Sequence, residues 1–273
     1  MNSLITRIIS AIVAVIIVGL LYYFKDTEGL RYLCYMAPIL GVRELMRILY
    51  KPDEFWGIKF TFGILTIAVY WLALLYPENS TLGFAVASIL FCCVAIVFEK
   101  RFEDLEALSL FQAKGILGFF YIGLLPALAT RLLDLENGKI WFLTMLAVVF
   151  AGDTFAYITG MLWGKKKILP KISPKKTVVG SLGGLAGSAI AGGLMGHLYL
   201  SHFPLWGIIS VSIVTGLIAQ LGDLFESMLK RVANRKDSGS IMPGHGGILD
   251  RLDGVLFGAP IMLAGALLLQ KLL

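Results

Sequence analysis

Residues 204–222 read P-L-W-G-I-I-S-V-S-I-V-T-G-L-I-A-Q-L-G and continue directly into residues 223–253, D-L-F-E-S-M-L-K-R-V-A-N-R-K-D-S-G-S-I-M-P-G-H-G-G-I-L-D-R-L-D. The first part is apolar and long enough to cross a bilayer as a helix. The second part gathers acids, cations, glycines and a histidine in a chain that is only 15% charged. This stretch therefore predicts a membrane helix whose polar end opens into a reaction site.

The polar end of this helix should present a mixed set of groups on one face. At about 100° per residue, Asp223, Ser227, Lys230 and Arg231 fall within one sector of the helix. One carboxylate, one hydroxyl and two cations would therefore lie side by side.

The segment that follows has the composition of a loop. Ser238-Gly-Ser240 and Pro243-Gly-His-Gly-Gly247 form turns, and their glycines let backbone N–H groups approach an anion. Two further carboxylates, Asp250 and Asp253, precede the last apolar run. Because carboxylates hold Mg²⁺ and cations neutralise phosphate charge, the segment suits chemistry on phosphates. The plainer interpretation, a basic loop that only obeys topology rules, leaves the acids, serine, histidine and glycines without a role.

The same stretch resembles the signature of phosphatidate cytidylyltransferases, also called CDP-diacylglycerol synthases. That pattern runs serine, any, apolar, Lys-Arg, four any, Lys-Asp, any, small, two any, apolar, Pro or Gly, any, His-Gly-Gly, apolar, any, Asp-Arg, apolar, Asp. The chain meets it without a gap or a mismatch at Ser227, Leu229, Lys230, Arg231, Lys236, Asp237, Gly239, Met242, Pro243, His245, Gly246, Gly247, Ile248, Asp250, Arg251, Leu252 and Asp253. A match of that length is highly specific.

A second polar region lies earlier in the chain. Asp153 interrupts the apolar run at residues 140–163, roughly 15 Å before its end. An ionisable group at that depth is a functional candidate, and a hydrogen-bonded acid in a helix contact is the alternative. The lysine-rich loop that follows contains Ser173-Pro-Lys-Lys-Thr177, which resembles a shorter motif of the same family. Taken alone, this basic run is a topology signal, and the glycines after it are typical of a packing face: Gly180, Gly184, Gly187, Gly192 and Gly196.

The resemblance implies an enzyme that transfers CMP from CTP to phosphatidic acid, giving CDP-diacylglycerol and pyrophosphate for phospholipid biosynthesis. Mg²⁺ is the expected cofactor, and a second metal or a monovalent ion is left open. The expected metal ligands are Asp223, Asp250 and Asp253. The expected catalytic residues are Ser227, Lys230, Arg231, Asp250, Arg251 and Asp253. The expected substrate-binding residues are Asp153, Lys175, Lys176, Lys236, Asp237, His245, Gly246 and Gly247.

The composition predicts an all-α polytopic membrane protein, because 58% of the residues are hydrophobic. The three cysteines lie in apolar runs and indicate neither a disulfide nor a metal site. The second apolar run is short, so eight or ten spans are alternatives to the nine that hydropathy predicts. The nine predicted spans are Leu4–Phe24, Leu30–Val42, Gly57–Tyr76, Leu82–Phe98, Gly115–Leu133, Ile140–Trp163, Ser181–Leu200, Pro204–Gly222 and Val255–Gln270.

The distribution of lysine and arginine predicts the orientation. With nine spans and a cytoplasmic N-terminus, most of the 24 Lys and Arg residues fall on the inner side. Both polar loops, residues 164–180 and 223–254, would then face the cytoplasm. We expect one integral membrane domain over residues 1–273, with 1–139 mainly a scaffold and 140–273 the catalytic half. In a bacterium it would lie in the inner membrane.

The residues leave two other functions open. A CTP-dependent kinase of a polyprenol-type lipid would use the same nucleotide. An anion transporter would favour inverted repeats, whereas the informative polar residues here crowd into the C-terminal half. The expected partners are CTP and phosphatidic acid in the membrane, with no nucleic acid. A homodimer and the acyl-chain preference are left open by the sequence.

Overall fold

The computed structural model describes residues 3–50, 56–239 and 246–272, with side chains from Lys25 onward. Across these ranges the chain is helical and contains no β-strand element, and an isolated β-bridge joins Lys167 to Thr177. The prediction of an all-α protein is confirmed for this part of the chain.

By its internal contacts the chain divides into two compact units, Met1–Thr130 with Asp237–Asp250 and Arg131–Lys236 with Arg251–Leu273. The helices of the first unit are α1 (Ser3–Leu49), α2 (Trp56–Leu75), α3 (Ser80–Val97), α4 (Leu105–Gly118) and most of α5 (Leu125–Arg131). The helices of the second are α6 (Gly138–Trp163), α7 (Val178–Tyr199), α8 (Leu205–Val232) and all but the start of α9 (Leu249–Gln270).

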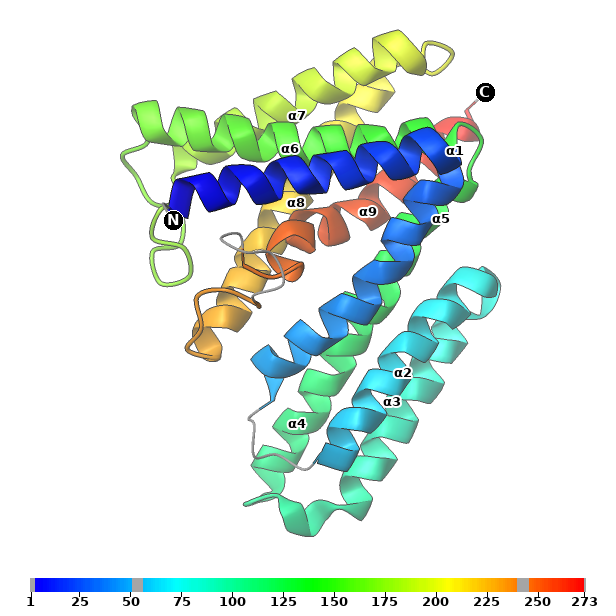
Figure 1. Cartoon of the computed structure of the whole chain (residues 1–273), viewed down its shortest axis with the longest axis vertical. Coiled ribbons are helices and arrows are strands. Elements are labelled where there is room, and N and C mark those ends of the chain that lie inside the picture. The colour runs from blue at the N-terminus through cyan, green and yellow to red at the C-terminus, as the bar shows by residue number, and fades with distance from the viewer. Residues whose placement is uncertain (1–2, 51–55, 240–245, 273) are drawn as a thin grey trace. The chain divides into compact units, whose positions relative to one another are not determined.

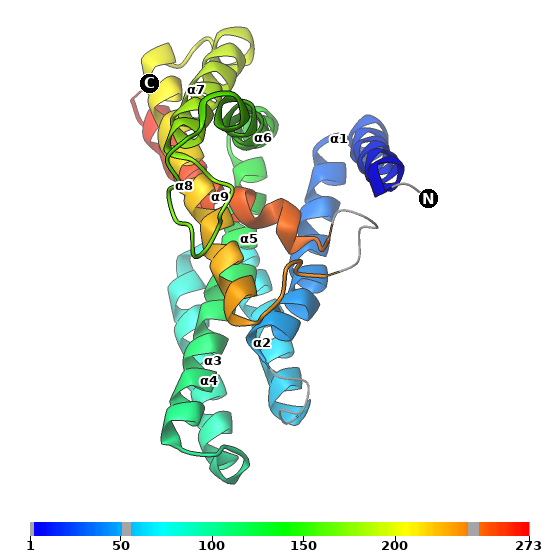
Figure 2. The same cartoon turned by 90° about the vertical axis from the view of Figure 1, so that its left-hand side faces the viewer.

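The first unit is held together by aromatic packing. Figure 2 shows α2, α3 and α4 side by side, as their contacts require. Phe62 stacks on Phe119 with ring centroids 5.6 Å apart, and Phe91 stacks on Phe111 at the same separation. Gly115 makes this approach possible, because a Cβ there would overlap the ring of Phe91. α1 is bent at Asp26, where the backbone leaves helical geometry.

The helices of the second unit pack closely where α7 carries glycines. α6 packs along α7, and α7 along α8 (Figures 1 and 2). All five α7 glycines in the predicted packing face are buried. A Cβ at Gly187 would lie 2.9 Å from the backbone oxygen of Ala151, and one at Gly184 would lie 3.0 Å from that of Gly152. The packing interpretation of these glycines is therefore confirmed.

We expect Gly187→Ala to lower the free energy of unfolding by about 1–3 kcal/mol, because the new methyl group would press on backbone that cannot rotate away. Thermal unfolding in detergent measures this. Gly193→Ala is the matched control on the same helix, since its Cβ would meet only Ile209 at an ordinary 3.5 Å. Equal stability of the two variants would contradict the packing argument.

Seven helical stretches in the described ranges are long and apolar enough to cross a membrane. Each overlaps one of the last seven predicted spans, and together they indicate a membrane protein. The first two predicted spans, Leu4–Phe24 and Leu30–Val42, both fall within α1. The total of nine spans and the side on which the N-terminus lies stay predictions.

Candidate functional site

The predicted site residues belong to both compact units. Those of the first unit that the structure describes are Asp237, Gly246, Gly247 and Asp250. Those of the second unit are Asp153, Lys175, Lys176, Asp223, Ser227, Lys230, Arg231, Lys236, Arg251 and Asp253. His245 lies outside the described residues.

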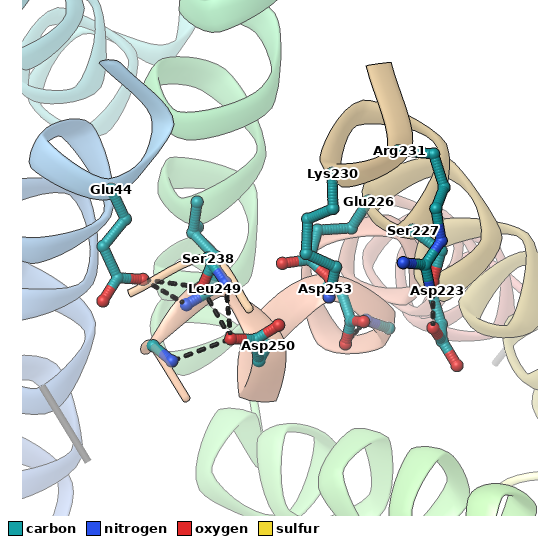
Figure 3. A network of polar contacts seen from close by, with 12 residues as sticks. Glu44, Asp223, Glu226, Ser227, Lys230, Arg231, Ser238, Leu249, Asp250 and Asp253 are labelled. Atoms are coloured by element: carbon teal, nitrogen blue, oxygen red, sulfur yellow. Dashed lines mark hydrogen bonds and ion pairs between the residues drawn. The ribbon is translucent and has the colours of Figure 1, made fainter. Parts of the chain in front are cut away.

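In the second unit, Asp223 is the centre of a polar cluster in the C-terminal third of α8. Lys176 Nζ lies 2.6 Å from Asp223 Oδ2, and Ser227 Oγ donates to Asp223 Oδ1 at 3.3 Å (Figure 3 shows the latter contact). The shared face of Asp223 and Ser227 was predicted from helical spacing and is confirmed. Because both partners of the ion pair are partly exposed, it contributes at most about 1 kcal/mol. A phosphate or a metal ion could therefore replace one partner at little cost.

The lysine-rich loop between α6 and α7 is hydrogen-bonded to α8 before and after Asp223 in the sequence. Lys176 Nζ donates to the backbone oxygen of Gln220 at 3.5 Å, and Arg231 Nε donates to that of Ile172 at 3.4 Å. Thr177 ends the loop as the N-cap of α7, accepting from the backbone N–H of Gly180 at 3.1 Å. The loop is thus positioned by side chains that sequence spacing alone could not pair.

Gln220 is a polar residue that the sequence analysis missed. Its Nε2 donates to the backbone oxygen of Ser181 at 3.2 Å, and its Oε1 accepts from the Ser181 hydroxyl. An amide inside an apolar run was the available signal, because an amide that is even partly withdrawn from water needs such partners.

Two further acids lie near Asp223. Asp153 on α6 is close enough to Asp223 and Lys176 for their charges to act on its carboxyl. Asp253 on α9 packs beside α8, since a Cβ at Gly222 would lie 2.5 Å from its backbone oxygen. Asp253 Oδ1 also accepts from the backbone N–H of Gly254 at 2.8 Å. Asp153 and Asp253 therefore lie within electrostatic range of the Lys176–Asp223 pair.

Mg²⁺ is the metal ion expected at this group of acids. Across the described ranges, no three His, Cys, Asp or Glu side chains converge as a ligand group. Mg²⁺, however, is usually held by only one or two carboxylates plus substrate phosphates, with water completing the shell. The hard oxygen donors of Asp223 and Asp253 fit that ion.

Helical spacing placed Lys230 on the face of Asp223, but Lys230 forms an ion pair with Glu226. Its Nζ lies 2.5 Å from Glu226 Oε2, one turn back along α8, and the Glu226 side chain is fully buried (Figure 3). The sequence analysis gave Glu226 no role. The signal was a Glu–Lys pair at i and i+4 on a helix with an apolar face.

In the first unit, Asp250 accepts hydrogen bonds from both ends of the signature loop, which we define as residues 237–248 between α8 and α9. Its Oδ2 accepts from Ser238 N at 2.9 Å, Ser238 Oγ at 2.8 Å and Gly247 N at 2.7 Å (Figure 3). Gly246 has φ of 84°, a left-handed conformation that favours glycine, and a Cβ there would overlap Asp250 Oδ2. The glycines therefore serve the geometry of this carboxylate.

The remaining predicted residues are exposed side chains: Lys175, Lys236, Asp237 and Arg251. Exposure leaves the long cations able to reach a ligand, and it gives Asp237 no packing role.

Glu44 on α1 is the second residue that the sequence analysis missed. It is buried, with 1% of its surface exposed, and it contacts the signature loop. The available signal was its position, because Glu44 lies on the helix face of Gly41, Leu45 and Ile48, which are also buried.

Apolar helices and clustered carboxylates and cations at their ends define a class of protein, helical membrane proteins equipped for phosphate chemistry. A family model for the cytidylyltransferase family matches residues 5–269. The chain belongs to the cytidylyltransferase family and is a nucleotidyltransferase.

The chain is also similar to known proteins over most of their length. The chain is 33% identical to the phosphatidate cytidylyltransferase of Staphylococcus haemolyticus over 258 residues, which covers 94% of this chain and 96% of the relative. It is 32% identical to that of Synechocystis sp. over 301 aligned positions, covering 98% of each. It is 36% identical to that of Brucella abortus over 186 residues, covering 67% of this chain and 63% of the relative.

Proposed function

We propose that this chain transfers the cytidylyl group of CTP to phosphatidic acid, releasing pyrophosphate and leaving CDP-diacylglycerol in the membrane. The names of the relatives and the near-complete coverage support the substrate pair. The observation that carries the proposal is the Lys176–Asp223 ion pair, with the carboxyls of Asp153 and Asp253 within electrostatic range of it. Such a mixed cluster at the ends of apolar helices suits one soluble and one lipid polyanion.

The reaction forms one P–O bond and breaks another. An oxygen of the lipid phosphate attacks the α-phosphorus of CTP, and the bond from that phosphorus to the α–β bridging oxygen breaks as pyrophosphate leaves. The attacking oxygen is already ionised, so the protein must position it and needs no base to deprotonate it.

The acids and cations of the cluster divide this work in our proposal. Asp223 and Asp253, with Asp250, would hold Mg²⁺, which when bound neutralises charge on the triphosphate. Lys176, Arg231 and Arg251 would face the phosphates. Ser227 and the loop of His245, Gly246 and Gly247 would orient the substrates. Lys230 is paired with Glu226, which neutralises part of its positive charge. Only the remainder of that charge would act on the phosphates.

The charge distribution supports a topology of nine spans with a cytoplasmic N-terminus and both polar loops facing the cytoplasm, where CTP is found. In a bacterium the membrane would be the inner one. Residues 140–273 would supply most of the chemistry and residues 1–139 mainly the scaffold.

We expect Lys176→Met to lower kcat/KM for CTP about 10–100-fold, because one charge-assisted hydrogen bond to a phosphate contributes about 1.5–3 kcal/mol. Steady-state kinetics in mixed micelles measures this. Lys271→Met is the control, since that lysine is exposed beyond the end of α9. A Lys176→Met enzyme with unchanged kcat/KM would remove the residue from the site.

Product analysis tests the function. Purified protein incubated with CTP, phosphatidic acid and Mg²⁺ should form a CDP-lipid and pyrophosphate in equal amounts. Free CDP with a phosphorylated lipid would instead identify a lipid kinase. Anion flux into sealed vesicles without CTP consumption would identify a transporter.

A further inference from the structure

Glu44 places a carboxylate where an apolar side chain would be expected. The residue lies near the end of α1 and is almost completely buried, as are Leu45 and Ile48 beside it. A buried carboxylate is costly unless hydrogen bonds compensate for its lost hydration. Its contacts therefore indicate what it does.

These contacts join the two ends of the signature loop. Glu44 Oε2 accepts from Ser238 Oγ at 3.0 Å and from the backbone N–H of Leu249 at 3.0 Å (Figure 3). Leu249 is the first residue of α9, where a helix leaves backbone N–H groups unpaired and favours negative charge. One carboxylate oxygen thus fixes both the beginning of the loop and the start of the helix that follows it.

The same serine connects Glu44 to Asp250. Ser238 Oγ lies 2.8 Å from Asp250 Oδ2, and its backbone N–H donates to that oxygen at 2.9 Å. A serine hydroxyl carries one proton and can donate to only one of the two carboxylates at a time. The backbone N–H holds Asp250 in either case, so Glu44 acts on Asp250 by fixing the position of Ser238.

The glycines of the loop are shaped around Glu44. A Cβ at Gly239 would overlap Glu44 Oε1, and a Cβ at Gly247 would overlap both Glu44 Oε2 and Ser238 Oγ. Two glycines of the loop therefore leave room for the carboxylate, and Ser238, which contacts it, is fully buried.

We propose that Glu44 is a positioning residue for Asp250, acting through Ser238 and the start of α9. The inference rests on the proposed function, in which Asp250 takes part in catalysis. Glu44→Ala removes the acceptor of two hydrogen bonds and lowers kcat about 10–100-fold, the size found when supporting residues of a site are removed. Glu44→Gln keeps an acceptor oxygen in a side chain of the same shape, and it restores kcat to within about 10-fold of the wild type.

Two measurements separate positioning from general loss of fold. Limited trypsin cleavage after Arg235 and Lys236 reports how firmly the chain just before Ser238 is held, and Glu44→Ala accelerates it at least several-fold while cleavage elsewhere changes little. A double-mutant cycle with Ser238→Ala gives a double variant no slower than the slower of the two single variants, because the two residues act in series. Glu106→Ala, an exposed acid on α4, is the control.

The outcomes are distinct. Wild-type kcat in Glu44→Ala overturns the proposal, and so do multiplying effects in the double variant. Unchanged cleavage at Arg235 and Lys236 in Glu44→Ala also overturns it, whatever the enzyme's reaction proves to be. If Glu44→Ala does not fold, the failure of Glu44→Gln to keep activity in a folded protein overturns it. A wild type that forms no CDP-lipid contradicts the proposed function, and the cleavage assay still decides the role of Glu44.

Discussion

Asp250→Asn is expected to reduce turnover by at least about 10²-fold while the protein stays folded. An asparagine carbonyl oxygen can take the place of Oδ2 and accept from Ser238 and Gly247, so the loop keeps its geometry. The negative charge is lost, and removal of one preorganised electrostatic group commonly costs 10²–10³ in kcat. The measurement is kcat for CDP-lipid formation beside thermal unfolding.

Asp104→Asn is the matched control for this change. Asp104 also accepts a backbone N–H, that of Ala107 at 2.7 Å, as the N-cap of α4. Asparagine and aspartate are equivalent caps, so this variant should retain both stability and activity. Near-normal turnover in Asp250→Asn would limit Asp250 to holding the loop and would remove it from the proposed metal site.

Lys230→Met is expected to lower the free energy of unfolding by about 3 kcal/mol and to lower turnover as well. The substitution removes the cation that pairs with a fully buried carboxylate, that of Glu226. Breaking one side of a buried pair is far more costly than replacing both sides by apolar groups. Glu226→Leu with Lys230→Met should therefore recover most of the stability in thermal unfolding.

The double variant also separates the two roles of Lys230. If Lys230 acts on a phosphate, turnover stays low in the double variant although stability returns. Turnover that returns together with stability would limit Lys230 to a structural role. Glu28→Gln is the control, because its carboxylate is exposed and its pair with the half-buried Arg31 contributes less than about 1 kcal/mol. An equal loss of stability in that control would contradict the argument from burial.

Much of the fold could be predicted, because membrane helices can be recognised in a sequence by their length and apolar composition. Most ends of the seven runs from Gly57 to Gln270 agree with the helical stretches of the structure within about one turn, but three stretches extend further, back to Leu105, back to Leu249 and on to Val232. The bend of α1 at Asp26 could not be predicted, because a single non-helical residue leaves no trace in hydropathy. The π-helical segment Phe119–Leu124 was hidden in the same way.

The site was predictable where residues lie on one element and hidden where contacts join distant ones. The Asp223–Ser227 contact follows from a spacing of four on a helix. The Lys176–Asp223 pair links residues 47 apart, and Glu44 meets Ser238 across 194 residues. Periodicity says nothing about such pairs. Glu226 and Lys230 lie one turn apart on α8, so their spacing allows the contact. The sequence alone did not reveal that the Glu226 side chain is buried.

Position-specific labelling of CTP tests the proposed reaction most directly. Purified protein is incubated with phosphatidic acid, Mg²⁺ and CTP that carries ³²P at either the α or the γ position, and the lipid is then extracted. Transfer of the cytidylyl group predicts α-label in the lipid and γ-label in water-soluble pyrophosphate. Label that enters the lipid from the γ position, with none from the α position, would contradict the proposed function and identify a kinase.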